Sequence, residues 1–316
     1  MALTYIWPLA AALPIYLAYK RLVSRPSRPL RIPPAQERVL IIGASSGIGR
    51  VIAHTYSKRG ARVCVVSRRQ GELAAVHAEC VAASASEERI LSVVADCANA
   101  EDMIRVRDAV EKSWQGLDTV IMSAGVSALR PLLEVAEVEG SEKATAQGSQ
   151  KAVDAALAAM QVNYVGPLLS AVTFIPLLSS TSPSPSILLI SSLAAAIPAP
   201  TRSIYASSKA AALLLFQALA IEHPAVAFSY ILPSTVQGAF RASAVDGGTV
   251  REANPQTHGL PVDAVAARCV RAVDAREKVV FYPAFYRWAQ LLYWFWPSFV
   301  ERKASQKYNF ESSASQ

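Results

Sequence analysis

Two side chains four residues apart, Tyr205 and Lys209, are the strongest chemical signal in the sequence. In a helix they would project from one face, where the ammonium group can stabilise a tyrosine phenolate near neutral pH. Such a tyrosine can protonate a reduced carbonyl oxygen or take the proton of an alcohol. Ser192 follows a β-branched run and adds a hydroxyl that can stabilise negative charge on the same oxygen. A tyrosine and a lysine at this spacing are common by chance, so the interpretation depends on the elements around them.

A glycine-rich turn near residue 43 predicts a site for a nucleotide pyrophosphate. The segment Gly43-Ala44-Ser45-Ser46-Gly47-Ile48-Gly49 follows an apolar run and precedes a helical pattern that ends near Arg59. The glycines permit a tight turn, close approach of the backbone to a pyrophosphate, and close packing of helix on strand. The helix N-terminus adds N–H donors and positive potential. The residues assigned to cofactor binding here are Gly43, Ser45, Ser46, Gly47, Ile48 and Gly49.

The end of the second predicted strand bears on the choice of cofactor. NAD-binding sheets of this kind usually place an acid there for the ribose 2′-hydroxyl. This chain has Ser67-Arg68-Arg69 instead, a hydroxyl and two guanidinium groups that suit a 2′-phosphate through charge-assisted hydrogen bonds. We therefore expect NADPH or NADP, with NADH less favoured. The alternative is that both arginines are ordinary solvated loop charges.

Short β-branched runs alternate with longer helical patterns between residues 38 and 282. This alternation predicts an α/β fold of the doubly wound Rossmann type, with a seven-stranded, mostly parallel sheet and helices on both faces. No cluster of proline and glycine in the middle of the chain indicates a linker. The predicted strands are Arg38–Ile42, Arg62–Ser67, Ile90–Ala95, Thr119–Met122, Ser186–Ile190, Val226–Leu232 and Val279–Tyr282.

In this order the motifs resemble the short-chain dehydrogenase/reductase family over roughly Arg38 to Tyr282. The thirteen-residue step from Ser192 to Tyr205 makes the combined match specific. The matching pieces are the glycine turn, Asp96, Ala124-Gly125, Asn163, Ser192, Tyr205, Lys209 and Pro233.

The resemblance implies a role for each matching residue. Tyr205 would be the acid/base, Lys209 would hold the nicotinamide ribose, and Ser192 would orient the substrate oxygen. Asn163 would hold a water that links Lys209 to bulk solvent. The remaining implied cofactor contacts are Asp96 to the adenine, Ala124 and Gly125 after the fourth strand, and the loop Pro233 to Val236 to the carboxamide.

Two segments lie between the matching motifs. Glu137 to Gln150 is rich in Glu, Gly, Ser and Lys, and we interpret it as a surface insertion. Gly238 to Gly259 falls where family members carry the substrate lid, which varies because substrates vary. Ser191 precedes the family position of the serine by one residue, and we interpret it as structural.

The first 20 residues predict a membrane anchor. No charged residue occurs from Met1 to Tyr19, and this apolar stretch is just long enough to span a bilayer. Lys20, Arg21, Arg25, Arg28 and Arg31 follow, which predicts a catalytic domain that faces the cytosol. A cleaved signal peptide is the weaker alternative, because its positive charges would precede the apolar run.

The stretch Phe281 to Val300 holds ten of the chain's 25 aromatic residues and leads into a basic tail. Tyrosine and tryptophan favour the bilayer interface, so we expect an interfacial segment that docks the domain on a membrane or shapes the mouth of an apolar pocket. Packing against the domain or against a dimer partner is an equal alternative. The predicted organisation is an anchor at 1–20, a basic, proline-rich linker at 21–37, a catalytic domain at 38–282, and an aromatic segment with a basic tail at 283–316.

Composition limits the other classes of function. Apolar residues make up 52% of the chain and the net charge is +7, of which the stretch from Lys20 to Arg31 supplies +5. The rest is nearly neutral, so we expect no nucleic-acid partner. The four cysteines and four histidines show no ligand spacing, and we expect no metal site.

These observations predict a membrane-attached NADP(H)-dependent oxidoreductase acting on a ketone or secondary alcohol. The two ends resemble those of the membrane-anchored, hydroxysteroid-dehydrogenase-like members of the family, which implies a hydrophobic substrate of lipid, steroid or retinoid type. The endoplasmic reticulum or a lipid droplet is the expected membrane. The resemblance also implies a homodimer, formed through the helices that bear Asn163 and Tyr205. The alternative function is a catalytically idle NADPH-binding scaffold or sensor at a membrane.

Overall fold

A computed structural model describes residues 27–138, 143–252 and 255–310. The predicted anchor at 1–20 lies outside these residues. The described chain forms a seven-stranded sheet in the order β3-β2-β1-β4-β5-β6-β7. A mostly parallel sheet was expected, and in the structure every neighbouring pair of strands is parallel. Each of the first six strands is followed by helical segments that return the chain to the opposite edge, which is why the strands share one direction.

The strands lie close to the predicted ranges, with shifts of one residue in β3 and β6. The strands are β1 Arg38–Ile42, β2 Arg62–Ser67, β3 Ile90–Val94, β4 Thr119–Met122, β5 Ser186–Ile190, β6 Ala227–Pro233 and β7 Val279–Tyr282. The longer helices are α2 Gly47–Lys58, α3 Gln70–Ser84, α4 Ala100–Trp114, α6 Ala146–Met160, α7 Gly166–Thr181, α8 Ser203–Glu222, α10 Val262–Ala275, α11 Tyr286–Phe295 and α12 Pro297–Lys307. The short helices are η1 Arg28–Leu30, η2 Pro34–Gln36, η3 Glu87–Arg89, η4 Gln161–Val165, α5 Leu132–Val135, η5 Leu193–Ala195, η6 Ala239–Ser243 and α9 Pro255–His258.

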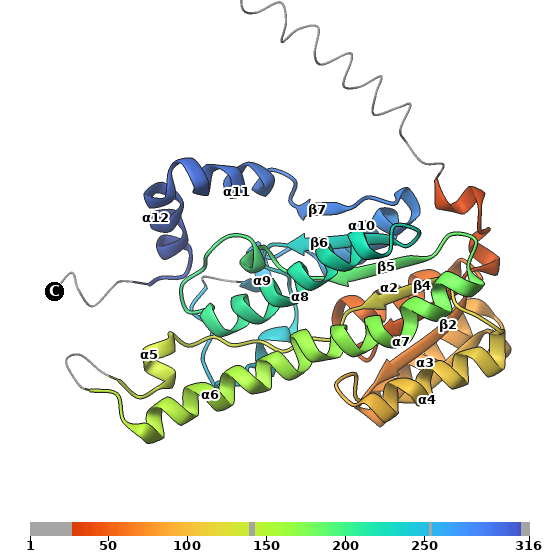
Figure 1. Cartoon of the computed structure of the whole chain (residues 1–316), viewed down its shortest axis with the longest axis horizontal. Helices are drawn as coiled ribbons and strands as arrows, with labels where there is room; N and C mark the ends of the chain where they lie inside the picture. Colours follow the sequence, from red (N-terminus) through yellow and green to blue (C-terminus); the bar gives the residue numbers. More distant parts are fainter. Residues whose placement is uncertain (1–26, 139–142, 253–254, 311–316) are drawn as a thin grey trace, which may run out of the picture.

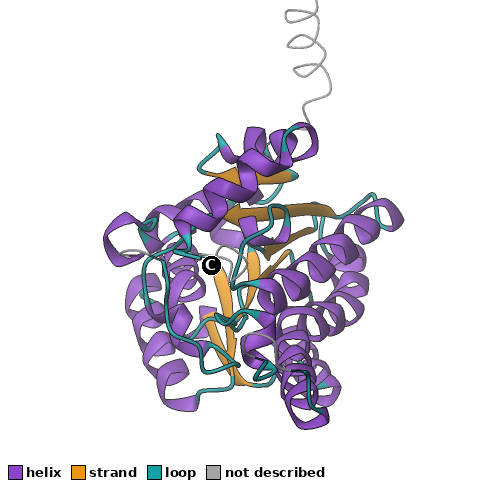
Figure 2. Cartoon of the chain, turned by 90° about the vertical axis from the view of Figure 1, so that its left-hand side faces the viewer, coloured by secondary structure: helices purple, strands orange, loops and turns teal. Residues whose placement is uncertain are grey.

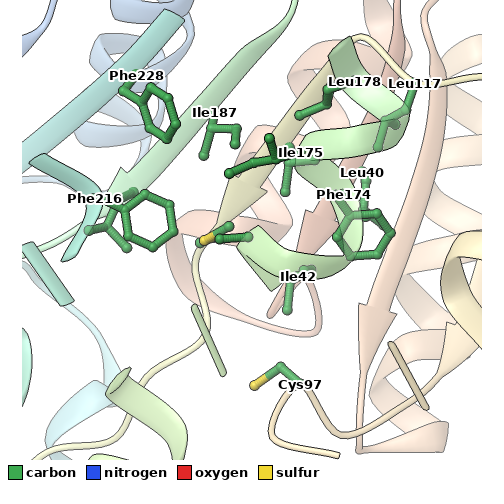
Figure 3. Close-up of a cluster of buried hydrophobic side chains, with 14 of the residues drawn as sticks. Leu40, Ile42, Cys97, Leu117, Phe174, Ile175, Leu178, Ile187, Phe216 and Phe228 are labelled. Carbon is green, nitrogen blue, oxygen red and sulfur yellow. The ribbon is translucent and has the colours of Figure 1, made fainter. Parts of the chain in front are cut away.

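Helices cover both faces of the sheet, so the molecule has three layers (Figure 2). Leu40 and Ile42 of β1 pack on the face covered by α4, α7 and α8. Their neighbours Val39 and Ile41 pack on the opposite face, under α2, α3 and α10. Figure 3 shows the first of these clusters, with side chains of the sheet against those of α7 and α8. Strands buried on both faces read as continuous apolar runs, and this made them recognisable in the sequence.

The segment interpreted as a surface insertion is instead partly helical. Residues 139–142 lie outside the described ranges, but Ala146–Gln150 already belongs to α6, which continues through the π-helical turn η4 into α7. By length and composition, two of the described helices could cross a membrane, Ala146–Thr181 and Ser203–Glu222. Both bury one side against the sheet, as core helices of this fold must.

Arg28 corrects one part of the sequence interpretation. It was counted with the membrane-flanking cations, but its guanidinium is buried and pairs with Glu37. Arg28 also donates to the carbonyl oxygens of Asp118 and Ser184, both at 2.9 Å. These partners stand at the N-terminal ends of β4 and β5, so the residues after the predicted anchor attach to the edge of the sheet opposite the carboxyl ends.

The last two helices lie beyond β7, at the edge of the sheet (Figure 1). Most of the large side chains of α11 do not pack against the domain. Trp288, Trp294 and Phe295 are 70%, 79% and 85% exposed. The alternative that this aromatic segment packs on its own domain therefore does not hold for these residues.

Candidate active site

A cleft of about 670 Å³ opens at the carboxyl ends of the strands. It lies where the strand order reverses between β1 and β4, the position at which doubly wound sheets bind ligands. Most residues predicted for the site line it, namely Gly43, Ser45, Ser46, Gly47, Ile48, Ser67, Arg68, Ala124, Gly125, Ser192, Tyr205, Lys209, Pro233 and Val236. Gly49, Asp96 and Asn163 were also predicted, but they do not line the cleft.

The glycine turn is shaped by close backbone packing. Gly43 has φ +88°, and an added Cβ would lie 2.4 Å from the backbone nitrogen of Ala124. At Gly49 an added Cβ would lie 2.3 Å from the carbonyl oxygen of Gly43. Gly47 differs, since its φ is +56° and an added Cβ would meet no atom within 4 Å. Two glycines therefore bring strand and helix together, and the third leaves open space beside the N-terminus of α2.

Arg69 holds this turn from the second strand. Its guanidinium donates to the hydroxyls of Ser45 and Ser46, both at 2.8 Å, and it lies 3.2 Å from the carboxylate of Glu72. Arg68 lies 3.7 Å from the carboxylate of Asp96 and is more than half exposed. Two guanidinium groups and two serine hydroxyls thus converge at the end of β2. The sequence indicated Arg69 as a donor for a 2′-phosphate, but its hydrogen bonds to the glycine turn depend on the fold.

Tyr205 and Lys209 both point into the cleft from the first turns of α8. Lys209 donates to the carbonyl oxygen of Ile190 at 3.3 Å. Burial lowers the pKa of Lys209 to about 8, because removing the ammonium group from water disfavours its charged form. The Tyr205 ring is buried and meets the edge of the Phe240 ring at 5.9 Å between centroids. This arrangement can hold a phenol beside an ammonium group that exchanges its proton near neutral pH.

Asn163 occupies the π-helical turn between α6 and α7. Its side-chain oxygen accepts from the Val126 N–H at 2.9 Å, and its amide donates to the Val126 carbonyl oxygen at 2.9 Å. The same amide donates to the Ser208 hydroxyl at 3.0 Å. An added Cβ at Gly125 would lie 3.0 Å from both Asn163 Oδ1 and Lys209 Nζ, so the two polar atoms face one small space. The missing side chain of Gly125 keeps that space open.

Ser208 also belongs to the hydrogen-bonded group around Asn163, although no role was predicted for it from the sequence. Its hydroxyl donates to the Tyr205 carbonyl oxygen at 2.8 Å while it accepts from Asn163. The hydrogen bond between Asn163 and Ser208 connects the π-helical turn between α6 and α7 to α8. Serines commonly bond to their own helix in this way, so the sequence offered no distinguishing signal.

The two adjacent serines after β5 differ in their surroundings. The Ser192 hydroxyl caps the short helix η5 by accepting from the Ala194 N–H at 3.2 Å. Ser191 was interpreted as structural, yet its buried hydroxyl has no hydrogen-bond partner among the described residues. Because an unpaired buried hydroxyl is costly, and because Ser191 lines the cleft, a ligand atom is a fitting partner for it.

Three residues absent from the predicted site also form the walls of the cleft. The Arg202 guanidinium lies 4.4 Å from the centroid of the Tyr205 ring. Phe240 comes from the expected lid region, and Tyr308 follows the last helix of the described chain. Only the tertiary structure brings Tyr308 to the cleft, since it lies about a hundred residues from Tyr205 in sequence.

Within the described ranges no group of three or more His, Cys, Asp or Glu side chains is placed to hold a metal ion. All four cysteines are buried and free. Burial raises the pKa of Cys97 to about 11 and that of Cys64 and Cys269 to about 12, so these thiols stay protonated.

The family model of short chain dehydrogenases matches residues 37–247. The chain is 28% identical over 265 residues to 11-beta-hydroxysteroid dehydrogenase A of Sesamum indicum, covering 81% of this chain and 70% of that protein. It is 32% identical over 206 residues to 11-beta-hydroxysteroid dehydrogenase-like 3 of Arabidopsis thaliana, covering 64% of this chain and 60% of that protein.

Solved structures share the fold. A short chain dehydrogenase/reductase from Burkholderia phymatum, in complex with NAD, superposes with a TM-score of 0.68 at 19% identity, covering 81% of this chain and 92% of that one. An alcohol dehydrogenase from Thermococcus sibiricus, complexed with 5-hydroxy-NADP, gives a TM-score of 0.62 at 23% identity, covering 78% and 94%.

Proposed function

This chain belongs to the short-chain dehydrogenase family of oxidoreductases, and on that premise we propose that it transfers a hydride between NADP(H) and the carbonyl or alcohol carbon of a hydrophobic substrate. The observation that carries the proposal is the buried Lys209 beside Tyr205 in a cleft whose far end is the glycine turn. The nicotinamide, when bound, supplies the hydride acceptor or donor.

The residues of the cleft fit a dinucleotide. The N-terminus of α2 and the open space at Gly47 suit a pyrophosphate. The unpaired Ser191 hydroxyl lies further along the same cleft, toward Tyr205 and Lys209. Arg68 and Arg69, together with Ser67, offer donors for a 2′-phosphate, which is why NADP(H) is proposed over NAD(H).

Each of the four predicted catalytic residues has a separate task in the proposed reaction. Tyr205 exchanges a proton with the substrate oxygen, and the charged Lys209 stabilises the phenolate form of that tyrosine. Ser192 donates a hydrogen bond to the same oxygen as negative charge develops on it. Asn163 holds the segment around Val126 in place, and its oxygen shares the space at Gly125 with the ammonium group of Lys209.

A hydrophobic substrate is supported by the side of the cleft beyond Tyr205. Leu193, Ala194, Phe240 and Val262 line it and offer apolar surface. Relatives at 28% and 32% identity carry names of hydroxysteroid dehydrogenases, which fits a large apolar ketone or alcohol.

Attachment to a membrane, with the catalytic domain facing the cytosol, is part of the proposal. The exposed face of α11 presents Trp288, Leu291 and Trp294, and Arg287 lies on the same helix. Tryptophan side chains partition into the bilayer interface and cations favour anionic headgroups. Binding of the protein without residues 1–20 to vesicles should weaken strongly when Trp288 and Trp294 are replaced by serine; replacement of the exposed Ile104 on α4 by serine is the matched control.

A homodimer is proposed through α6, α7 and α8. These helices expose apolar side chains on the side away from the sheet, namely Val153, Leu157, Val172, Leu214 and Ile221. Exposed apolar side chains on neighbouring helices favour burial by a second copy. Sedimentation of the wild type and of a Leu157→Glu, Leu214→Glu variant tests this, since a dimer should become a monomer.

The first test of function uses microsomes that contain the wild type or Tyr205→Phe, supplied with NADPH and a total lipid extract. Mass spectrometry identifies species that gain two hydrogens. We expect a set of reduced lipids only with the wild type, and cofactor binding by both proteins. Equal reduction by both would contradict the acid/base role of Tyr205.

The competing function is a catalytically idle scaffold or sensor that binds NADPH at the membrane. A scaffold would bind cofactor and reduce nothing across lipid and polar ketone libraries. The observation against it is the set of polar groups around Tyr205, because a scaffold has no need of a buried lysine beside a buried phenol.

A further inference from the structure

The cleft contains a buried cationic side chain, Arg202, that has no negatively charged partner among the described residues. Arg202 is 8% exposed, and its recorded contacts are a 3.1 Å hydrogen bond to the Ser127 hydroxyl and the face of the Tyr205 ring. Within the described residues it forms no ion pair. A buried charge without a counter-charge is costly, and proteins retain such groups chiefly at functional sites.

The neighbouring charges do not neutralise Arg202. A small recess beside the main cleft is lined by both Arg202 and Arg241, together with Glu252 and Tyr308. The Glu252 carboxylate already accepts from Arg241 and from the Thr235 hydroxyl, and it lies 3.6 Å from Lys307. Lys307 is more than a third exposed, so water screens its charge. Among the buried groups of this recess, one positive charge remains uncompensated.

Arg202 also stands at the start of α8. Arg202 is the N-cap residue of α8 and provides no side-chain cap. An arginine side chain has no acceptor, so it cannot satisfy the first N–H groups of the helix. Both the guanidinium and the positive end of the helix dipole favour an anion here, and without one they repel each other.

Tyr308 supplies one more donor. Burial, with the nearby Glu252 carboxylate, raises the pKa of Tyr308 to about 12, so its hydroxyl keeps its proton at neutral pH. The main cleft, which Arg202 and Tyr308 also line, therefore contains a guanidinium and a phenol hydroxyl near Tyr205. One uncompensated charge matches a carboxylate, which carries one negative charge, better than a phosphate monoester, which carries nearly two.

We propose that the substrate carries a carboxylate a few bonds from the reacting carbonyl, and that Arg202 binds this carboxylate. The inference rests on the proposed function, since it names the class of substrate for the same site. The substrate is then an amphipathic keto or hydroxy acid, with its apolar part along Phe240 and Leu193. The short distance from Arg202 to the Tyr205 ring places the two functional groups of the substrate close together.

The test compares two ligands that differ only in charge, 4-oxodecanoate and its methyl ester. Their binding is measured by calorimetry on the full-length protein saturated with NADP+, in the wild type, Arg202→Met, Arg202→Lys and a surface control, Arg107→Met. NADP+ has no hydride to give, so the measurement reports binding alone. We expect the wild type and the surface control to favour the acid over the ester on the order of 10- to 100-fold.

In Arg202→Met the preference should fall to about one, and Arg202→Lys should restore part of it. The thermal midpoint of Arg202→Met should equal or exceed that of the wild type, because a buried unpaired charge has been removed. Equal affinities of the wild type for acid and ester, binding of neither ligand, or an unchanged preference in Arg202→Met would each overturn the proposal.

A separate assay keeps this inference distinct from the proposed function. Reduction of 4-oxodecanoate by NADPH is measured in the wild type and Tyr205→Phe. Charge-selective binding without Tyr205-dependent reduction would remove the enzyme proposal and leave the carboxylate site. Tyr205-dependent reduction of acid and ester with equal kcat/KM would support the enzyme proposal and reject the carboxylate site.

Discussion

The ammonium group of Lys209, in the second turn of α8, donates a hydrogen bond to the carbonyl oxygen of Ile190, the last residue of β5. Ser191 and Ser192 follow Ile190 directly. This contact therefore joins the helix that carries the tyrosine to the strand that precedes the serine.

The activity should depend on the charge of Lys209. Burial lowers its pKa to about 8, so the side chain is charged below that pH and loses its proton above it. Since the charged form stabilises the phenolate, kcat/KM for carbonyl reduction should decline as the pH rises through about 8. A pH profile with NADPH checks this. Lys209→Met should lose on the order of 100-fold or more in kcat at all pH values, and it should not show that decline.

Cofactor preference should depend on Arg69. Replacing it with serine removes a guanidinium that lies against the Ser45 and Ser46 hydroxyls. The Kd for NADPH should rise on the order of 10- to 100-fold, and the Kd for NADH should stay nearly constant. Fluorescence titration of both cofactors measures the two values, with Arg107→Ser as a surface control. An equal loss of affinity for both cofactors would contradict recognition of the 2′-phosphate.

Gly43 should not tolerate a side chain. Its φ of +88° is unfavourable for alanine, and the new Cβ would lie 2.4 Å from the Ala124 nitrogen. Gly43→Ala should lower the free energy of unfolding by several kcal/mol and abolish cofactor binding. Gly71→Ala, where an added Cβ meets nothing within 4 Å, should change stability by less than about 1 kcal/mol. Urea unfolding of both variants compares the two positions.

Breaking the ion pair of Arg28 should destabilise the domain. Arg28→Ala leaves the buried Glu37 carboxylate with only the Thr119 hydroxyl as a recorded partner. The free energy of unfolding should fall by about 3–5 kcal/mol, a range typical of buried pairs that lose one partner. Urea midpoints at constant m-value measure it. Arg31→Ala, at an exposed neighbour, should stay within about 0.5 kcal/mol of the wild type. A double replacement, Arg28→Met with Glu37→Met, should recover much of the loss.

Much of the fold could be predicted because its signals are local. Most strands are buried on both faces, so they form nearly continuous apolar runs, and glycine turns or polar loops separate them from the helices. The glycine turn and the Tyr205–Lys209 spacing are likewise contained within a few residues. The helical part of the predicted surface insertion, at residues 146–150, could not be predicted because helix α6 is rich in alanine and small polar residues, which gave no clear amphipathic pattern.

The position of Arg28 and the walls of the cleft could not be predicted in the same way. A basic residue after an apolar stretch has the same local sequence whether it faces lipid headgroups or a buried carboxylate. Tyr308 and Arg202 meet only because α12 returns across the carboxyl ends of the strands. Neither residue lies near the other in sequence.

By itself, the sequence determined the family, the order of the strands along the chain, and the residues proposed to exchange a proton and to bind a phosphate. Each of these depends on short patterns of residue type and spacing. The tertiary structure alone decided which charges are compensated and which side chains line the cleft. Those properties depend on burial and on contacts between distant segments, and the energy of a charge depends on its surroundings more than on its neighbours in sequence.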